Sequence, residues 1–240
     1  MPEAHPKMLQ PLCEDLALAL RAAAYHGLSE GVCNHFSVAL PDDSRRFLIN
    51  PRGLHWSEVG PGDIVLVDEH GAVLQGRHRV EPTAMFIHAA VHRITGRAVV
   101  LHTHMPYATA LAITEGEPFD WAVQSQLKFY GRTVIDPIYN GLALDRAEGE
   151  RIARAMQGKD VGFLGNHGVI VCGTSIAHAY DDLYYLERAC RHQVLAMSTG
   201  RPLARVDEAL SGRVAGQIQG EREQSDLFFA ALRRMLPAPR

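Results

Sequence analysis

The segment Ala98-Val99-Val100-Leu101-His102-Thr103-His104-Met105-Pro106 joins a buried-strand pattern to two histidines. Its first four residues form a short, continuous apolar run, which is typical of a strand covered on both faces. Residues two apart in a strand point to the same face, so His102 and His104 project together. Pro106 ends the strand and leaves both imidazoles at its carboxyl end, where α/β sheets commonly open their sites. Alone, the pair is equally compatible with a metal site and with hydrogen-bonded structural histidines.

Helix and strand patterns alternate on both sides of this segment. Helical patterns cover about residues 11–26, 82–94, 145–156 and 175–198, with Pro82 in a first turn and Asp145 as an N-cap. Strand patterns cover about residues 36–40, 47–49, 64–67, 133–135, 161–164 and 169–171. This interleaving predicts an α/β fold with helices packed on a mixed sheet. Since no linker or repeat interrupts the chain, we expect one domain over residues 1–240, with the helical segment 203–240 as an extension.

Composition excludes several classes of protein. The 240 residues are 47% hydrophobic and 21% charged, with a formal charge of −3, so no basic field for nucleic acid is expected. No uncharged apolar run reaches the ~18 residues of a membrane span, and the N-terminus lacks the pattern of a signal peptide. The four cysteines are scattered, which favours buried thiols and a cytoplasmic protein. Thirteen histidines justify a search for a metal site.

A third histidine lies in Gly165-Asn166-His167-Gly168, between two apolar strands. The glycines permit a tight connection that presents the imidazole from a rigid turn. With His102 and His104, it completes the three-imidazole set that Zn, Mn or Fe sites use. Glu81 directly precedes the helix start at Pro82, where a carboxylate either stabilises the helix terminus or acts as a base beside a cation. The rival pair in that helix, His88 and His92, is predicted to be structural, with His88 nearer the site.

Taken together, these motifs resemble the class II aldolase/adducin family over about residues 16–200. The resemblance rests on Asn34-His35-Phe36-Ser37, where Cys33 replaces a family glycine, on residues 49–53, on Glu81, on residues 102–104 and 166–168, and on the helix containing Leu186-Glu187. It implies an α/β/α sandwich and a cytoplasmic homotetramer with active sites at subunit interfaces. It further implies that one divalent ion per subunit is bound by His102, His104 and His167, with Glu81 as the acid/base.

The same resemblance suggests substrate-binding roles for Asn34, Ser37, Arg52 and Gly53. It also suggests that the region of Tyr130 can supply a proton donor to a neighbouring site, although ordinary packing is the favoured explanation for both Tyr130 and Tyr139. Sugar-phosphate aldolases of the family carry small hydroxyl residues just before the glutamate, where this chain has Arg79 and Val80. Valine cannot donate a hydrogen bond to a phosphate, whereas Arg79 and Arg52 can pair with a carboxylate. For Arg52, a structural salt bridge is an equal alternative.

These observations predict a metal-dependent carbon–carbon lyase for a non-phosphorylated hydroxy-carboxylate, such as a hydroxylated aromatic or pyridine dicarboxylate. Either decarboxylation or retro-aldol cleavage would fit. The alternatives are a sugar-phosphate aldolase, an epimerase or a dehydratase of the same family, and, more remotely, an iron oxygenase. A non-catalytic adducin-like interaction domain is the alternative from another class, but such a domain would not need to keep the histidines and Glu81.

Overall fold

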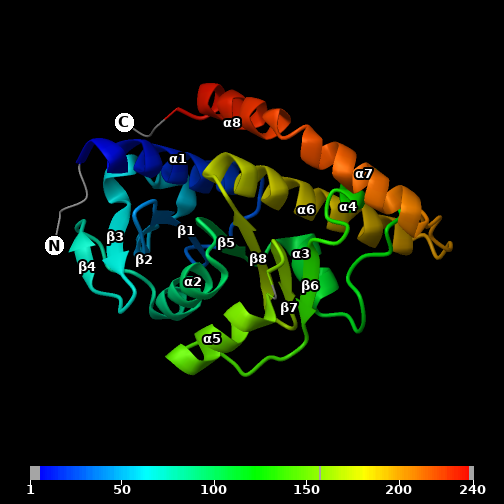
Figure 1. Cartoon of the computed structure of the whole chain (residues 1–240), viewed down its shortest axis with the longest axis horizontal. Helices are drawn as coiled ribbons and strands as arrows, with labels where there is room; N and C mark the ends of the chain where they lie inside the picture. Colours follow the sequence, from blue (N-terminus) through cyan, green and yellow to red (C-terminus); the bar gives the residue numbers. More distant parts are fainter. Residues whose placement is uncertain (1–5, 157, 238–240) are drawn as a thin grey trace.

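The computed structural model describes residues 6–156 and 158–237. In this part of the chain one eight-stranded sheet runs through the centre of the molecule, with helices on both faces (Figure 1). Its strands are β1 (His35–Leu40), β2 (Asp43–Ile49), β3 (Val65–Asp68), β4 (Val73–Gln75), β5 (Val99–Thr103), β6 (Thr133–Asp136), β7 (Val161–Leu164) and β8 (Gly168–Gly173). Their order is β4-β3-β2-β1-β5-β8-β7-β6, and only the β6–β7 pair is parallel. The predicted α/β fold with a mixed sheet is confirmed.

The helices form a layer on each face of this sheet (Figure 1). One layer contains α1 (Pro6–Tyr25), α3 (Pro106–Ala112) and α6 (Ile176–Met197), and the opposite layer contains α2 (Pro82–Thr95) and α5 (Arg146–Ala155). The short helix α4 (Gln124–Leu127) packs on α6, and two 3-10 turns cover Trp56–Glu58 and Pro61–Asp63. The last helices, α7 (Glu208–Gly220) and α8 (Glu223–Met235), run along the outer side of α6 in Figure 1. No described helix has both the length and the apolar character needed to cross a membrane.

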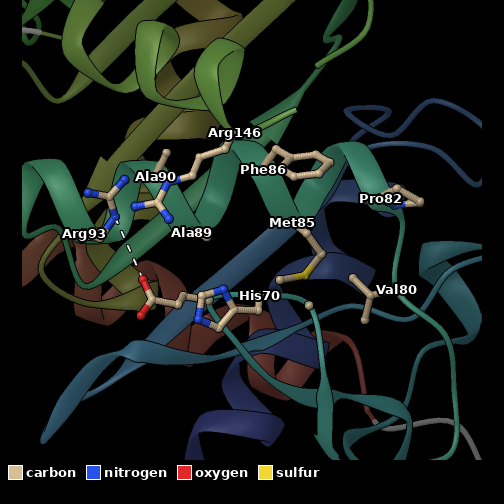
Figure 2. Close-up of a pocket in the computed structure, with 11 residues that line it drawn as sticks. His70, Val80, Pro82, Met85, Phe86, Ala89, Ala90, Arg93 and Arg146 are labelled. Atoms are coloured by element: carbon tan, nitrogen blue, oxygen red, sulfur yellow. Dashed lines mark ion pairs between the residues drawn. The ribbon is translucent and has the colours of Figure 1, made fainter. Parts of the chain in front are cut away.

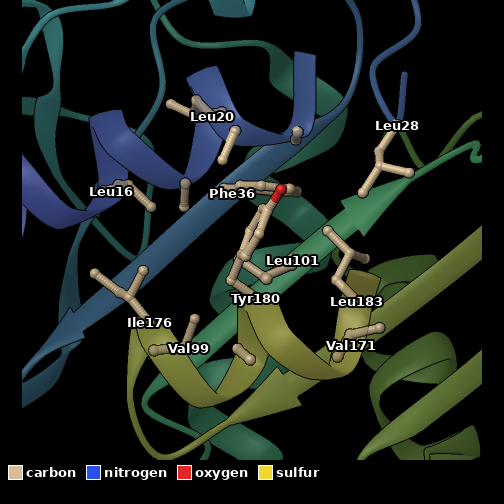
Figure 3. Close-up of a cluster of buried hydrophobic side chains, with 14 of the residues drawn as sticks. Leu16, Leu20, Leu28, Phe36, Val99, Leu101, Val171, Ile176, Tyr180 and Leu183 are labelled. Atoms are coloured by element: carbon tan, nitrogen blue, oxygen red, sulfur yellow. The ribbon is translucent and has the colours of Figure 1, made fainter. Parts of the chain in front are cut away.

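The central strands are buried by side chains from both helix layers. Figure 3 shows Leu16 of α1, Phe36 of β1, Leu101 of β5 and Tyr180 of α6 in one cluster, and each is fully buried. Burying one such aliphatic or aromatic side chain contributes about 1.5–3 kcal/mol. On the opposite face, the neighbouring β5 residue Val100 packs with α2 and α5. This alternation puts His102, two residues after Val100, on the α2 side of the sheet.

Two details of the helices and strands differ from the sequence-based expectation, and a third agrees with it. Helix α1 begins at Pro6 rather than near Pro11, so Pro6 takes the first helical position, where the missing N–H has no cost, and Pro11 lies inside the helix. Strand β4 was not predicted because all three of its residues are exposed and carry no burial pattern. The expected cap is present, since Asp145 accepts a hydrogen bond from the backbone N–H of Glu148 at the start of α5.

Candidate metal centre and active site

The ends of two adjacent central strands bring His102, His104 and His167 together. Strand β5 pairs antiparallel with β8, and Thr103 lies opposite Val169, so the end of β5 adjoins the turn that precedes β8. The ring centroids of the three histidines lie 4.8–5.1 Å apart. Within the described residues, they form the one group whose candidate ligand atoms all lie within 4.8 Å of one another. The spacing suits three ligands around one ion.

Hydrogen bonds fix which ring nitrogen is left for a cation. His102 Nδ1 lies 3.0 Å from the carbonyl oxygen of Val169, which can only accept, so Nδ1 carries the proton and Nε2 keeps its lone pair. His104 Nδ1 lies 2.5 Å from the Glu30 carboxylate, and its Nε2 is buried without a hydrogen-bond partner among the described residues. A buried imidazole nitrogen with no partner, beside two other imidazoles, fits a metal ligand. The residues present therefore fit a divalent cation.

The surroundings of His102 and His167 favour the neutral form of both imidazoles. Burial, together with the adjacent His104 ring, lowers the pKa of His167 to about 4. Burial also lowers the pKa of His102 well below its usual value, with neighbouring imidazoles acting in the same direction. The neutral imidazole is the form that coordinates a metal, so both side chains are ready to bind at neutral pH.

Gly168 is required by the close approach of the two strand ends. A Cβ atom at this position would lie 2.6 Å from Cδ2 of His104 and 2.8 Å from the carbonyl oxygen of Thr103. Both separations are too short for non-bonded atoms, so any larger residue would displace His104 or the strand. The preceding Asn166 adopts a left-handed conformation with φ of 54°, which asparagine tolerates in a tight turn. The turn thus presents His167 while leaving room for His104.

A cavity of about 340 Å³ opens beside the three histidines. Arg52, which follows β2, and Glu81, which precedes α2, both line it and form an ion pair with 2.7 Å between Arg52 Nε and the Glu81 carboxylate. Glu81 occupies the N-cap position of α2, but its side chain caps no backbone N–H. Asn34 also lines the cavity, and its side-chain oxygen accepts a 3.2 Å hydrogen bond from the backbone N–H of His104. A carboxylate, a guanidinium and an amide thus share one cavity with the three imidazoles.

The remaining predicted site residues do not line this cavity within the single chain. The side chain of Arg79 is exposed, but its backbone carbonyl accepts a 2.8 Å hydrogen bond from the N–H of Arg52. Gly53 turns the chain directly after Arg52 with φ of 86°. The ring of Tyr130 lies against Trp121, with centroids 5.0 Å apart. Tyr139, in contrast, lines the cavity, with its ring centroid 6.2 Å from that of His167.

A second cavity, of about 370 Å³, lies on the other side of the segment that leads into α2 (Figure 2). Val80 and Pro82 line this second cavity, whereas Glu81 and Thr83 line the histidine cavity. Glu81 has an extended backbone just before α2, so its side chain and that of the preceding Val80 point to opposite sides. Val80 therefore does not face the histidines, and Arg52 is the arginine that lines the histidine cavity and can bind a substrate anion there.

Sequence reasoning missed His35, the residue after Asn34. Its ring is buried and lies 5.6 Å from the ring of His102, with the two rings close to parallel. It lines the cavity, and burial lowers its pKa to about 3. The signal that could have found it is its place in the Asn34-His35-Phe36-Ser37 motif. The structure then places His35 opposite His102 in the β1–β5 pairing.

Ser37 bridges two buried histidines and does not line the cavity. His92 Nδ1 lies 2.8 Å from the carbonyl oxygen of Arg97, so His92 Nε2 must accept. Ser37 Oγ lies 2.7 Å from that Nε2 and 2.5 Å from His88 Nδ1. The hydroxyl therefore donates to His92 and accepts from His88. These hydrogen bonds agree with the structural role expected for the two α2 histidines. His88 lies nearer the site, with its ring centroid 5.6 Å from that of His35.

We expect Ser37→Ala to destabilise the protein by about 1–3 kcal/mol, because both histidines would lose their partner in a fully buried place. Urea unfolding of the metal-free protein measures this loss. Ser198→Ala is the control, since the Ser198 hydroxyl is exposed and surface changes stay within about 0.5 kcal/mol. Unchanged stability together with a raised KM would instead show that Ser37 binds substrate.

Stability is also expected to fall on mild acidification. Burial lowers the pKa of His92 to about 4 from its usual 6.5, so between these values the unfolded chain binds a proton that the folded chain does not. The contribution of His92 to the free energy of unfolding is thus fully present above about pH 6.5 and is lost as the pH falls toward 4. Between pH 7 and pH 5 this loss is about 2 kcal/mol. The lowered pKa of His88 acts in the same direction. Urea unfolding with chelator at pH 5–8 tests this, and a flat profile would contradict it.

Comparisons with known proteins agree with this fold. A family model described as the class II aldolase and adducin N-terminal domain matches residues 14–194. The chain is 30% identical over 224 residues to the decarboxylase NovR of Streptomyces niveus, which covers 91% of this chain and 83% of that protein. An aldolase II superfamily protein from Pseudomonas syringae superposes with a TM-score of 0.89 at 30% identity, covering 98% of this chain and 94% of that chain. An L-fuculose 1-phosphate aldolase from Glaciozyma antarctica superposes with a TM-score of 0.84 at 26% identity, with the same coverage of both chains. This chain belongs to the class II aldolase and adducin family.

Proposed function

We propose that this protein is a divalent-metal-dependent carbon–carbon lyase that acts on a non-phosphorylated hydroxy-carboxylate, by decarboxylation or retro-aldol cleavage. The observation that supports it most is the single cavity shared by the three imidazoles and the Arg52–Glu81 pair. A divalent cation on His102, His104 and His167 supplies Lewis acidity toward a substrate oxygen. A non-catalytic interaction domain would have no need for these groups to converge.

The chain's own residues would orient the substrate and move the proton. The Nε of Arg52 pairs with the Glu81 carboxylate, and the other N–H groups of Arg52 can bind a substrate carboxylate in a fixed, bidentate geometry. In decarboxylation, carbon dioxide leaves and the electron pair stays on the substrate carbon. In retro-aldol cleavage, the Glu81 carboxylate would first take the proton of the substrate hydroxyl, so that an aldehyde can leave and the electron pair stays on the neighbouring carbon. The Glu81 carboxyl group would then deliver a proton to that carbon, or remove one in the reverse direction. Asn34 would hold the backbone of His104 in place through its hydrogen bond.

Two relatives guide the choice of reaction. The similarity to a decarboxylase favours decarboxylation, and we propose a hydroxylated aromatic or pyridine dicarboxylate as the substrate. The similarity to a fuculose-phosphate aldolase keeps retro-aldol cleavage as the second candidate. Arg52 can bind either a carboxylate or a phosphate, and assays with both classes of substrate distinguish the two.

Finer features of the proposal rest on the family resemblance. We propose a zinc, manganese or iron ion, a cytoplasmic homotetramer and active sites shared between subunits. In such a tetramer, Tyr130 would serve a neighbouring subunit, whereas Tyr139 already lines the cavity of its own chain.

Product analysis with and without chelator tests the proposal. The protein, loaded in turn with zinc, manganese and iron, would be incubated with hydroxy-dicarboxylates and with sugar phosphates. Release of carbon dioxide or of an aldehyde from a non-phosphorylated acid, lost on chelation, is the expected result. Isomerised or dehydrated products would indicate an epimerase or dehydratase, and cleavage of sugar phosphates alone would overturn the proposed substrate class.

A further inference from the structure

Glu30 lies outside the residues so far placed in the cavity, yet it contacts a proposed metal ligand directly. Its carboxylate oxygen is 2.5 Å from His104 Nδ1, although the two residues are 74 positions apart in the sequence. Because a carboxylate only accepts, His104 Nδ1 must carry the proton of this bond. The other ring nitrogen, Nε2, is the buried atom that has no partner among the described residues.

The segment around Glu30 is attached on both sides to the end of β5, which keeps this exposed carboxylate in position. Before it, the carbonyl oxygen of Leu28 accepts a hydrogen bond from the Thr103 hydroxyl. After it, the Asn34 side chain accepts a hydrogen bond from the backbone N–H of His104. Between them, Glu30 and Cys33 form an isolated bridge, closed by a 2.9 Å backbone hydrogen bond. The contact with His104 thus follows from the local fold.

Glu30 also differs from the other carboxylate near the histidines in the charge that it brings. Glu81 is paired with Arg52, so the two together contribute little net charge. Glu30 contacts an imidazole instead, with its carboxylate on Nδ1 of His104. A carboxylate that accepts the second N–H of a ligating histidine fixes the ring's orientation and makes the ligand more basic.

We propose that Glu30 is a positioning residue for the metal centre, which holds His104 in the Nδ1–H tautomer and keeps Nε2 available to the cation. This assignment rests on the metal site of the proposed function. His102 obtains the same tautomer from the backbone carbonyl of Val169, which no substitution removes. Glu30 is therefore the side chain through which the affinity of the site can be altered without touching a ligand.

The test measures zinc affinity of the full chain by competition with a chromophoric chelator, in the absence of any substrate. We expect Glu30→Ala to weaken zinc binding by about 10–100-fold. Glu30→Gln should weaken it less, because the amide oxygen still accepts a hydrogen bond from Nδ1. Glu117→Gln is the control, since Glu117 is exposed and does not line the cavity. Nitrogen-15 spectra of histidine-labelled, metal-free protein should show that His104 loses its Nδ1–H preference in Glu30→Ala but keeps it in Glu30→Gln.

The thermal midpoint of the metal-free protein should be unchanged in each variant, which separates this role from a structural one. Equal zinc affinity in wild type and Glu30→Ala would overturn the assignment while leaving the lyase proposal intact. Weakened zinc binding in a protein that cleaves no carbon–carbon bond would refute the lyase proposal and leave the assignment standing. A wild-type protein that bound none of zinc, manganese and iron would overturn both.

Discussion

Replacing His102 with alanine should abolish tight zinc binding and lower kcat/KM by about 10³-fold or more. The reason is that Lewis-acid stabilisation is worth several kcal/mol, and each 1.36 kcal/mol is about a tenfold change in rate. Two imidazoles would remain, and they are too few for a catalytic zinc site of the usual three protein ligands. Elemental analysis and kinetics on the substrate found by product analysis measure the two effects together.

Two further variants make this result interpretable. His102 is fully buried, so His104→Ala, at a partly exposed ligand, shows whether metal loss occurs without damage to the core. His70→Ala is the matched control, because His70 is an exposed histidine that lines the second cavity (Figure 2). Full metal content in both ligand variants would contradict the assignment of the three histidines.

Replacing Glu81 with glutamine should lower kcat by about 10²–10⁴-fold, the usual contribution of a general acid or base. The amide has the size of the carboxylate and can still accept a hydrogen bond from Arg52, so the pocket should keep its shape. Zinc affinity should stay close to that of the wild type, since the cation is held by the three imidazoles. Steady-state kinetics and chelator competition on the same sample measure both quantities.

The matched control for Glu81 lies in the neighbouring cavity. Glu69 is also a carboxylate beside α2 that pairs with an arginine, with 4.0 Å between its carboxylate oxygen and Arg93 Nε. Glu69→Gln should leave kcat unchanged. If Glu81→Gln lost zinc in proportion to its activity, Glu81 would be a metal ligand, and its assignment as the acid/base would be wrong.

Local patterns were sufficient to predict the central strands and several helix ends. The apolar runs around residues 99–101, 161–164 and 169–171 lie in β5, β7 and β8, because strands buried on both faces need apolar residues at every position. Strand β4 could not be found in this way, since its residues are exposed and the strand is defined by its pairing with β3. The order of the strands depends on contacts between distant segments, which periodicity does not encode.

The candidate site shows the same division between local and long-range information. His102 and His104 were grouped by strand periodicity, and His167 was added because of its turn. Arg79 could not be separated from Arg52 by sequence, because which of two arginines enters a cavity depends on how the loops pack. Glu30 carried no sequence signal at all, since its contact with His104 is made between segments far apart in the chain.

The strand register at the site decides how the protein responds to loss of its metal. The β1–β5 and β5–β8 hydrogen bonds hold the backbone that carries the ligands, and Gly168 lets the strand ends approach closely. The imidazoles are therefore preassembled by the sheet, and a bound ion does little to order the chain. Unlike small zinc domains, which unfold without metal, this protein should remain folded when stripped and reload on return of the ion. Metal supply would then act as a reversible switch of activity without altering how much folded protein is present.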